Sequence, residues 1–179
     1  MKQISKFLSF ILRHKPEQIG IQLDHEGWTN IDELIKLSKN DIKLNYQLIK
    51  DVVEQNDKKR FQISEDGLNI RAVQGHSTNM VKRELTPIKP PDILYHGTAS
   101  RFIESIQQNG LIAGSRHHVH LSENKDTSTE VGKRYGKPIL LIIDSKQMFE
   151  DGFDFFKSEN NVWLTDNVPK QYLYIFNSI

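Results

Sequence analysis

A proline-rich stretch divides the chain and limits the folds that are open to it. Residues 76–92, HSTNMVKRELTPIKPPD, contain three prolines and no steady hydrophobic period. Proline fixes one backbone dihedral and removes a hydrogen-bond donor, so this composition is typical of a linker and not of a helix or a central strand. We therefore predict two structural units, residues 1–77 and 93–179, joined by a linker over residues 78–92.

The first unit has the element order of a winged helix. Apolar residues at helical spacing predict a first helix that ends near Pro16, and two more helices are predicted in GWTNIDELIKLS and NDIKLNYQLIKDVVEQND. Thr29 or Asn30 is placed to cap the second helix. RFQIS, EDGLN and IRAVQ then have the order strand, tight turn, strand. Three helices followed by a two-stranded wing predict a winged-helix lobe.

The second unit alternates short strands with short helices, which predicts an α+β fold with a β-rich core. The predicted strands are ILYHGT, HVHLS, PILLIID, FDFFKSE, VWLTD and YLYIF. PILLIID is expected to be fully buried because its apolar run is unbroken. The predicted helices are SRFIESIQQNG, with Ser100 as a possible cap and a stop at Asn109 and Gly110, and TSTEVGKRYG.

Composition narrows the chemistry and the location. The 179 residues include no cysteine, which excludes disulfides, thiolate catalysis and thiolate metal sites. No apolar run has the length of a membrane span and no cleavage-site pattern follows the first helix, so we expect a cytoplasmic protein without a membrane partner. The net charge is only +1, so a nucleic-acid partner would have to bind local basic clusters.

Arginines and histidines gather at the predicted ends of elements. LSFILRHKPE, residues 8–17, ends an apolar helix face with Arg13 and His14. Cations in a last helical turn offset the helix dipole without any chemistry. However, His14 lies seven residues after Phe7, and this spacing predicts a ring turned toward the protein body, with Arg13 at the edge of that face. Such a pair could hold an anion.

The same residue types recur further along the chain. An arginine carries a permanent charge on a planar fork that matches two phosphate oxygens, so several arginines together indicate a phosphate site, although any single one is usually a solvated surface residue. The further members of this set are Arg60, which opens the first wing strand, Arg71, Gln74, His76 and Ser77 just past the second, His96 at a strand end, and Arg134 between two glycines.

The histidines of SRHHVHLS suggest a metal site as an alternative. His118 and His120 share one face of the predicted strand, which is a spacing that a metal could use. No Asp, Glu or Cys stands beside them at a recurring metal-site spacing, and no H-E-x-x-H is present, so we expect no metal. Walker, G-x-G-x-x-G and G-x-S-x-G motifs do not occur either.

Eight motifs in one order carry a family resemblance that runs from about residue 4 to about residue 175. They are LSFILRH, GWTNIDEL, KKRFQIS, RAVQGHS, LYHGT, SRHHVHLS, GKRYGKPILLIID and NVWLT. Together they resemble the RNA 2′-phosphotransferase family, the NAD-dependent enzymes known from tRNA splicing. The resemblance implies a winged-helix N-terminal lobe that binds RNA and a C-terminal lobe with the ADP-ribosyltransferase fold, which binds NAD.

The resemblance also implies roles for residues of this chain. The family's catalytic tetrad falls on Arg13, His14, Arg60 and Arg134, whereas Arg71 is not counted as catalytic. The expected RNA contacts are Arg13, His14, Arg60, Gln74 and His76. The expected NAD site comprises the triad His96, His120 and Val162 together with Gly97, Thr98, Leu121 and Ser122. Many ADP-ribosyltransferases have a catalytic glutamate where this chain has Val162.

The reaction implied by the resemblance has two steps and no metal. The RNA 2′-phosphate attacks the anomeric carbon of the nicotinamide ribose and expels nicotinamide, which gives RNA-2′-phospho-ADP-ribose. The neighbouring ribose hydroxyl then attacks the phosphorus and releases 2′-hydroxyl RNA and ADP-ribose 1″,2″-cyclic phosphate. The nucleophile is already a dianion, so the site only has to orient it and stabilise charge, which arginines and a histidine can do. We expect a monomer that consumes NAD and acts on tRNA-like RNA.

Two other functions stay open at this point. A protein ADP-ribosyltransferase would share the second lobe, but Val162 argues against it. A non-catalytic nucleic-acid regulator would share the winged helix, but the near-neutral charge and the second lobe argue against it. Release of nicotinamide that requires 2′-phosphorylated RNA would separate all three.

Overall fold

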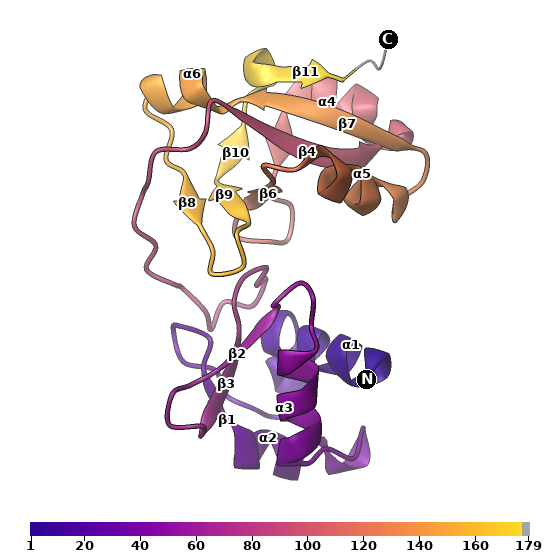
Figure 1. Cartoon of the computed structure of the whole chain (residues 1–179), viewed down its shortest axis with the longest axis vertical. Coiled ribbons are helices and arrows are strands. Elements are labelled where there is room, and N and C mark those ends of the chain that lie inside the picture. The colour runs from indigo at the N-terminus through magenta and orange to yellow at the C-terminus, as the bar shows by residue number, and fades with distance from the viewer. Residues whose placement is uncertain (177–179) are drawn as a thin grey trace. The chain divides into compact units, whose positions relative to one another are not determined.

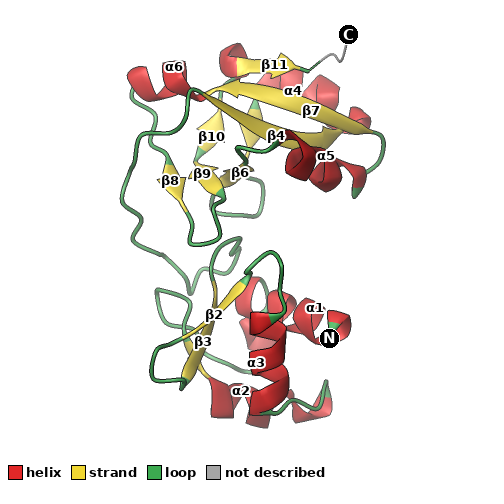
Figure 2. Ribbon diagram, in the orientation of Figure 1, coloured by secondary structure: helices red, strands yellow, loops and turns green. Residues whose placement is uncertain are grey.

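The chain folds into two compact units. The computed structural model describes residues 1–176, and its units are Met1–Glu84 and Leu85–Ile179 (Figure 1). The division lies inside the stretch expected to be a linker. Both units mix helices with strands, which confirms the predicted α+β class (Figure 2). Among the described residues, no helix combines the length and the apolar character that a membrane crossing requires.

The first unit consists of three α-helices and a three-stranded antiparallel sheet. The helices are α1 (Lys2–Arg13), α2 (Ile31–Leu37) and α3 (Tyr46–Glu54), with 3₁₀ turns at Pro16–Gln18 and Ser38–Asn40. The strands are β1 (Thr29–Asn30), β2 (Phe61–Ile63) and β3 (Asn69–Ala72), in the order β1–β3–β2. The predicted strand pair is therefore present, and β1 adds a third strand that the sequence did not indicate.

Asparagine side chains set where α2 and α3 begin. Asn30 Oδ1 accepts a hydrogen bond from the Glu33 amide at 3.0 Å, which confirms one of the two predicted caps. Asn45 Oδ1 accepts from the Leu48 amide at 2.8 Å in the same way. The prediction that the helix also includes residues 40–44 is wrong. Asparagine competes for backbone N–H groups and so favours helix starts over helix interiors, which delays α3 to Tyr46.

The core of the first unit rests on the apolar face of α1. Leu8, Ile11 and Leu12 have no solvent exposure. They belong to one buried cluster with Ile49 of α3 and Ile70 of β3. The helix therefore has one face fixed by the core, while its opposite face remains at the surface.

The second unit contains several small antiparallel sheets and three short α-helices within its described residues. The helices are α4 (Ile103–Asn109), α5 (Lys125–Lys133) and α6 (Ser145–Glu150), with 3₁₀ turns at Ser100–Phe102 and Lys170–Tyr172. The first sheet has the order β11 (Leu173–Ile175), β7 (Pro138–Asp144), β4 (Ile93–Ala99). The second has the order β6 (Val119–Leu121), β9 (Trp163–Thr165), β8 (Phe156–Lys157), and β5 (Leu111–Ile112) pairs with β10 (Asn167–Val168).

Two glycines let α5 lie directly on β4. A Cβ atom at Gly97 would overlap the carbonyl oxygen of Ser128, and a Cβ atom at Gly132 would lie 2.5 Å from the carbonyl oxygen of Thr98. Real Cβ atoms do not approach backbone oxygens so closely, so both positions require glycine. This contact fixes the C-terminal end of α5, where Arg134 is the C-cap residue.

Three local predictions in this unit are wrong. The strand PILLIID, β7, was expected to be fully buried, but only Leu140, Leu141 and Ile143 are buried. His96 was expected at a strand end, but β4 continues through His96, Gly97, Thr98 and Ala99 because the bare backbone at Gly97 packs on α5 instead of turning away. Ser100 makes no side-chain cap, since the chain enters α4 through a 3₁₀ turn. The predicted stop of α4 is confirmed, with Gly110 at a φ of 76°.

Candidate functional site

The C-terminal end of α1 is bound to the segment that follows β3. The carbonyl oxygen of Arg13 accepts hydrogen bonds from the amides of Ser77 at 2.8 Å and Thr78 at 3.3 Å. His14 Nδ1 lies 2.9 Å from Ser77 Oγ. Residues 13–14 and 77–78 are far apart in the sequence, so these bonds give the His14 ring a fixed position in the first unit.

Arg13 and His14 exchange the positions that helical spacing predicts. Arg13 is buried, with 9% of its surface exposed, whereas His14 is only partly buried. The reason is that α1 ends at Arg13, and His14 has a φ of −124° and a ψ of −44°, outside helical geometry. A seven-residue spacing counted from Phe7 therefore does not extend to His14.

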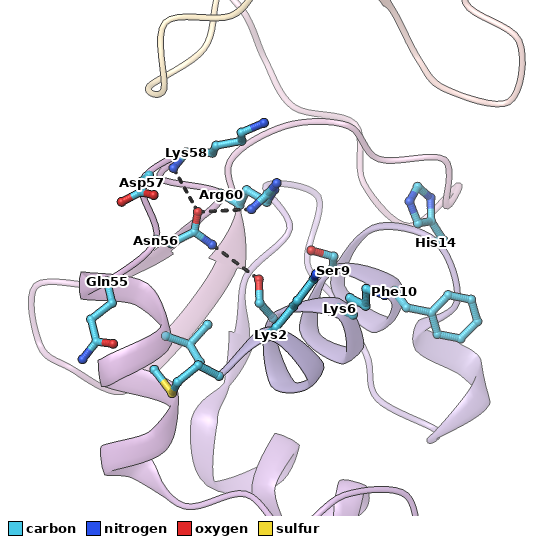
Figure 3. Close-up of a pocket in the computed structure, with 13 residues that line it drawn as sticks. Lys2, Lys6, Ser9, Phe10, His14, Gln55, Asn56, Asp57, Lys58 and Arg60 are labelled. Atoms are coloured by element: carbon cyan, nitrogen blue, oxygen red, sulfur yellow. Dashed lines mark hydrogen bonds between the residues drawn. The ribbon is translucent and has the colours of Figure 1, made fainter. Parts of the chain in front are cut away.

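A groove in the first unit contains both His14 and Arg60. It has a volume of about 660 Å³ and lies between the exposed face of α1 and the turn from α3 to β2 (Figure 3). Its lining consists of Met1, Lys2, Ser5, Lys6, Ser9, Phe10, His14, Val52, Gln55, Asn56, Asp57, Lys58 and Arg60. Of the residues that the sequence assigns to catalysis in this unit, the groove brings His14 and Arg60 together, and Arg13 is not part of its lining.

Asn56 holds Arg60 at the wall of this groove. Asn56 Oδ1 accepts hydrogen bonds from Arg60 Nη1 at 3.3 Å and from the Lys58 amide at 3.1 Å (Figure 3). Its amide nitrogen lies 3.5 Å from Ser5 Oγ on α1. The turn is completed by Lys59, which has a positive φ of 40°, uncommon for a residue with a side chain. Sequence reasoning missed Asn56, although the polar run QNDKKR before Arg60 marks a turn.

Other predicted residues of the first unit are buried away from this groove. His76 is 4% exposed, and its ring packs beside Gly27. Gln74 is partly buried, and its Oε1 has no hydrogen-bond partner among the described residues. Neither residue lines the groove. Their assignment as RNA contacts therefore stays a prediction.

Arg71 belongs to a structural network. Its guanidinium lies 4.4 Å from the centre of the Trp28 ring, and its Nε and Nη2 donate to Gln62 Oε1 at 3.0 and 2.9 Å. Glu26 lies 3.4 Å from Arg71 Nη1 and 3.3 Å from Arg83 Nε. These contacts connect strands β2 and β3, through Gln62 and Arg71, to Arg83 near the C-terminal end of the first unit.

In the second unit, His96 is fixed against β6. Its Nδ1 lies 2.9 Å from the carbonyl oxygen of His120, and Tyr95 and Ser122 exchange backbone hydrogen bonds at 2.8 and 2.9 Å. Burial lowers the pKa of His96 below its usual value, the hydrogen bond to His120 opposes this, and the charge of Arg116 adds to it. The ring is therefore neutral at pH 7. Because a carbonyl oxygen only accepts, Nδ1 carries the proton and Nε2 is an acceptor.

His120 has the complementary arrangement. Arg116 Nη1 lies 3.1 Å from His120 Nδ1, and since a guanidinium only donates, Nδ1 is the acceptor and Nε2 carries the proton when the ring is neutral. Leu121 pairs with Trp163, so Val162 is the residue next to this pair. The Tyr95–Ser122 bridge and the His96 contact connect the segments that carry His96, Leu121 and Ser122, and the assignment of these residues to NAD binding stays a prediction.

Glu123 supports this region and was missed at the level of sequence. Its Oε1 accepts from Trp163 Nε1 at 2.7 Å and from Lys157 Nζ at 3.0 Å. The Trp163 donor and then Lys157 lower the pKa of the Glu123 carboxyl group. Glu123, which follows β6, is thereby joined to Trp163, the neighbour of Val162, and to Lys157 of β8.

The groups around His96 and His120 include donors and acceptors that could hold sugar and phosphate groups. One imidazole acceptor, one imidazole donor and the Arg116 cation are suited to ribose hydroxyls and a diphosphate. His118, part of the alternative metal site, instead lies 3.7 Å from Asp166 Oδ1 and contacts the edge of Phe156. Within residues 1–176, no three His, Cys, Asp or Glu side chains stand close enough to share a metal ion.

Comparison with known proteins gives one consistent result. The chain matches the family described as RNA 2′-phosphotransferase, Tpt1 / KptA family, over residues 1–167. Its relatives named "Probable RNA 2′-phosphotransferase" include one from Pseudomonas syringae pv. tomato, 54% identical over 96% of this chain and 92% of the relative. Others come from Acaryochloris marina, 54% identical over 96% and 95%, and Flavobacterium johnsoniae, 53% identical over 96% and 94%. The chain therefore belongs to the RNA 2′-phosphotransferase family.

Proposed function

We propose that this chain removes an internal 2′-phosphate from RNA in a reaction that consumes NAD. In this proposal the first unit is a winged-helix lobe that binds RNA, and the second unit is an ADP-ribosyltransferase-like lobe that binds NAD. NAD supplies the acceptor of the phosphate, so that the products are 2′-hydroxyl RNA, nicotinamide and ADP-ribose 1″,2″-cyclic phosphate. The single observation that carries the proposal is the groove whose lining includes both His14 and an Arg60 held by Asn56.

Arg60 is suited to hold the phosphate. Asn56 accepts from one terminal nitrogen of the guanidinium, which fixes the plane of the fork. A fixed planar fork can bind two phosphate oxygens at once and stabilise the charge that develops on them. Arg13, and Arg134 from the second unit, are the other cations of the proposed tetrad.

His14 is suited to move a proton. Its Nδ1 is held by Ser77 Oγ, so Nε2 is the ring atom that would contact the phosphate or protonate the departing 2′-oxygen. An imidazole can serve as acid or base because its ordinary pKa lies near neutral pH. No residue has to generate the nucleophile, because the phosphate monoester is already anionic.

His96 and His120 are suited to orient the ribose of NAD. A neutral His96 presents Nε2 as an acceptor for a ribose hydroxyl, and a neutral His120 presents Nε2–H as a donor. Val162 supplies no carboxylate. The proposed reaction does not need one, because the RNA phosphate is itself an anionic nucleophile.

The first prediction tests this function through nicotinamide release. We expect the purified chain to release nicotinamide from NAD only when RNA with an internal 2′-phosphate is present. The RNA should lose its 2′-phosphate in the same reaction. His14→Ala and Arg60→Ala should each slow phosphate removal by about a hundred- to a thousandfold, because each removes a group that contacts the reacting phosphate. Chromatography of nicotinamide and gel analysis of the RNA measure both products.

Two controls make this test decisive. Arg101→Ala removes an exposed arginine of the 3₁₀ turn Ser100–Phe102, which the proposal does not use, and should keep the wild-type rate. The same RNA with a 2′-hydroxyl should give no nicotinamide. Nicotinamide release at an equal rate with protein acceptors and no RNA would instead assign a protein ADP-ribosyltransferase and overturn the proposal.

A further inference from the structure

The groove that contains His14 and Arg60 extends beyond them along one face of α1. Lys2, Ser5, Lys6 and Ser9 line it from the helix, at the spacing of one helical face. Asn56, Asp57 and Lys58 line the opposite wall from the turn after α3 (Figure 3). Of these lining residues, the proposed reaction uses only His14 and Arg60. The remaining length has no role in that reaction.

This unassigned length is strongly basic in a chain that is nearly neutral. Lys2, Lys6 and Lys58 line it together with a single carboxylate, that of Asp57. The whole chain has 24 lysines and arginines against 23 acidic residues, so the excess is local. Lys2 and Lys6 form no ion pair with any described residue, whereas Lys50 in the same unit pairs with Glu54 at 3.7 Å. Lysines without an ion-pair partner that face a groove, as Lys2 and Lys6 do, attract an extended polyanion.

The dimensions of the groove match a short single strand of nucleic acid. An α-helix rises 1.5 Å per residue, so Lys2 and His14 are separated by about 18 Å along α1. A stacked strand rises about 3.4 Å per nucleotide, so this length accommodates about five nucleotides. Ser5 and Ser9 lie between the lysines and offer hydroxyl groups to sugars and phosphates.

We propose that this lysine groove binds the RNA strand that adjoins the nucleotide with the 2′-phosphate. The strand would enter at Lys2 and Lys6, follow α1, and place its phosphorylated nucleotide at His14 and Arg60. This inference rests on the proposed function. It adds that the affinity for RNA depends on backbone phosphates on one side of the reacting nucleotide. An RNA strand is favoured over an acidic protein segment because the groove is continuous with the phosphate-binding residues.

The second prediction tests the groove by binding, without NAD. We compare a 2′-phosphorylated dinucleotide with strands extended by about five nucleotides on the 5′ side or on the 3′ side only. One extension should raise the affinity of the full chain roughly tenfold at low salt, and the other should have little effect. Fluorescence anisotropy with labelled RNA measures these affinities, and a parallel set of 2′-hydroxyl strands measures the groove apart from the reacting phosphate.

Paired lysine variants identify the groove as the cause. Lys2→Ala/Lys6→Ala should remove most of the gain from extension and reduce the slope of log K against log salt by about 1.4, since each single-strand phosphate contact contributes about 0.7. Lys36→Ala/Lys39→Ala removes two exposed lysines of α2 and the following turn and should keep both quantities. Alanine preserves helix propensity, so circular dichroism should show an intact α1.

Each outcome decides one question. If extension gives no gain on either side, or if the Lys2→Ala/Lys6→Ala chain keeps the gain, the groove does not bind the strand. Equal competition by a poly-glutamate peptide would assign the groove to acidic chains in general and also overturn the inference. If the extended strands bind as expected but no 2′-phosphate is removed in the presence of NAD, the groove is supported and the proposed function fails.

Discussion

At the scale of single residues, an amide group and a hydroxyl group help to position the side chains of the site. Asn56 fixes Arg60, and Ser77 fixes His14. A mobile arginine would have to lose side-chain entropy each time it bound a phosphate, and a fixed one has already lost it. These two partners are neutral, whereas a carboxylate in the same place would add a negative charge beside the bound phosphate.

The third prediction follows from this and concerns Asn56 as a positioning residue. Asn56→Ala removes the acceptor of Arg60 Nη1, so the turnover rate should fall by about ten- to a hundredfold through loss of orientation. Asn56→Asp keeps an oxygen acceptor but adds a negative charge beside the phosphate, so it should mainly raise the KM for RNA. Steady-state kinetics with 2′-phosphorylated RNA measure the two effects separately.

A structural role alone would give a different pattern for Asn56. If the residue only stabilised the turn, both variants would lower the thermal unfolding temperature and share one kinetic defect. Asn40→Ala provides the matched control, because Asn40 is an exposed asparagine at another turn of the same unit and does not line the groove. Wild-type kinetics in both Asn56 variants would contradict the positioning role.

At the scale of elements, the contact between β4 and α5 determines the geometry of the second unit. Backbone lies on backbone at Gly97 and Gly132, which leaves no space for a side chain. One side of this contact carries His96 on β4, and the other ends in Arg134 at the C-cap of α5. Two residues of the proposed site are thus positioned by two glycines that take no part in the chemistry.

The fourth prediction is that Gly97→Ala destabilises the second unit severely. Its methyl group would overlap the Ser128 carbonyl oxygen, so β4 and α5 must separate, at a cost of about 3 kcal/mol or more in the free energy of unfolding. Gly152→Ala is the control, since no heavy atom lies within 4 Å of its added Cβ and only its positive φ is strained, at roughly 1 kcal/mol. Urea unfolding followed by Trp163 fluorescence, in a Trp28→Phe background, measures both. Equal costs would show that α5 can move away freely.

The sequence predicts elements that depend on local rules and misses contacts between distant segments. The Asn30 cap, the stop of α4 at Gly110 and the paired strands β2 and β3 follow from residue type and spacing, and the structure confirms them. The placement of Arg13 and His14 depends on where α1 ends and on Ser77, which is 63 residues away from His14. No hydrophobic period contains that information.

The candidate site shows the same division. The sequence motifs predict His14, Arg60, His96 and His120 as residues of the site. Asn56 was missed because asparagine in a turn is ordinary, and its hydrogen bond to Arg60 becomes visible only when the turn is folded. The lysine groove was missed because Lys2, Lys6 and Lys58 come from two segments that adjoin only in three dimensions.

At the scale of the whole molecule, each unit has its own hydrophobic core and carries some of the residues that the proposed function uses. One cluster of buried side chains lies entirely within residues 8–81, and another within residues 94–172. Arg13, His14 and Arg60 belong to the first unit, whereas His96 and Arg134 belong to the second. The proposed function therefore assigns RNA binding and NAD binding to units with separate cores.

The fifth prediction concerns where the first unit ends. We expect the fragment 1–84 to fold alone and bind the extended RNA strand, but not to remove its phosphate. The fragment 1–77, which stops where the sequence placed the boundary, should be less stable because it lacks Val81, which has no solvent exposure. Burial of a valine side chain contributes about 1.5–3 kcal/mol. It also lacks Arg83, which donates to the Val73 carbonyl oxygen at 2.6 Å and contacts Glu26.

Urea unfolding of the two fragments decides whether the proline-rich stretch is a linker along its whole length. Residues 78–84 contain no regular helix or strand, so pattern alone offers no reason to include them in the first unit. Side-chain burial does offer one, because Val81 belongs to the core and the Glu84 amide donates to Glu26 Oε1 at 3.1 Å. If 1–77 is as stable as 1–84, these contacts add nothing and the linker begins at residue 78. If 1–84 is several kcal/mol more stable, the first seven residues of the expected linker are the last part of the first core.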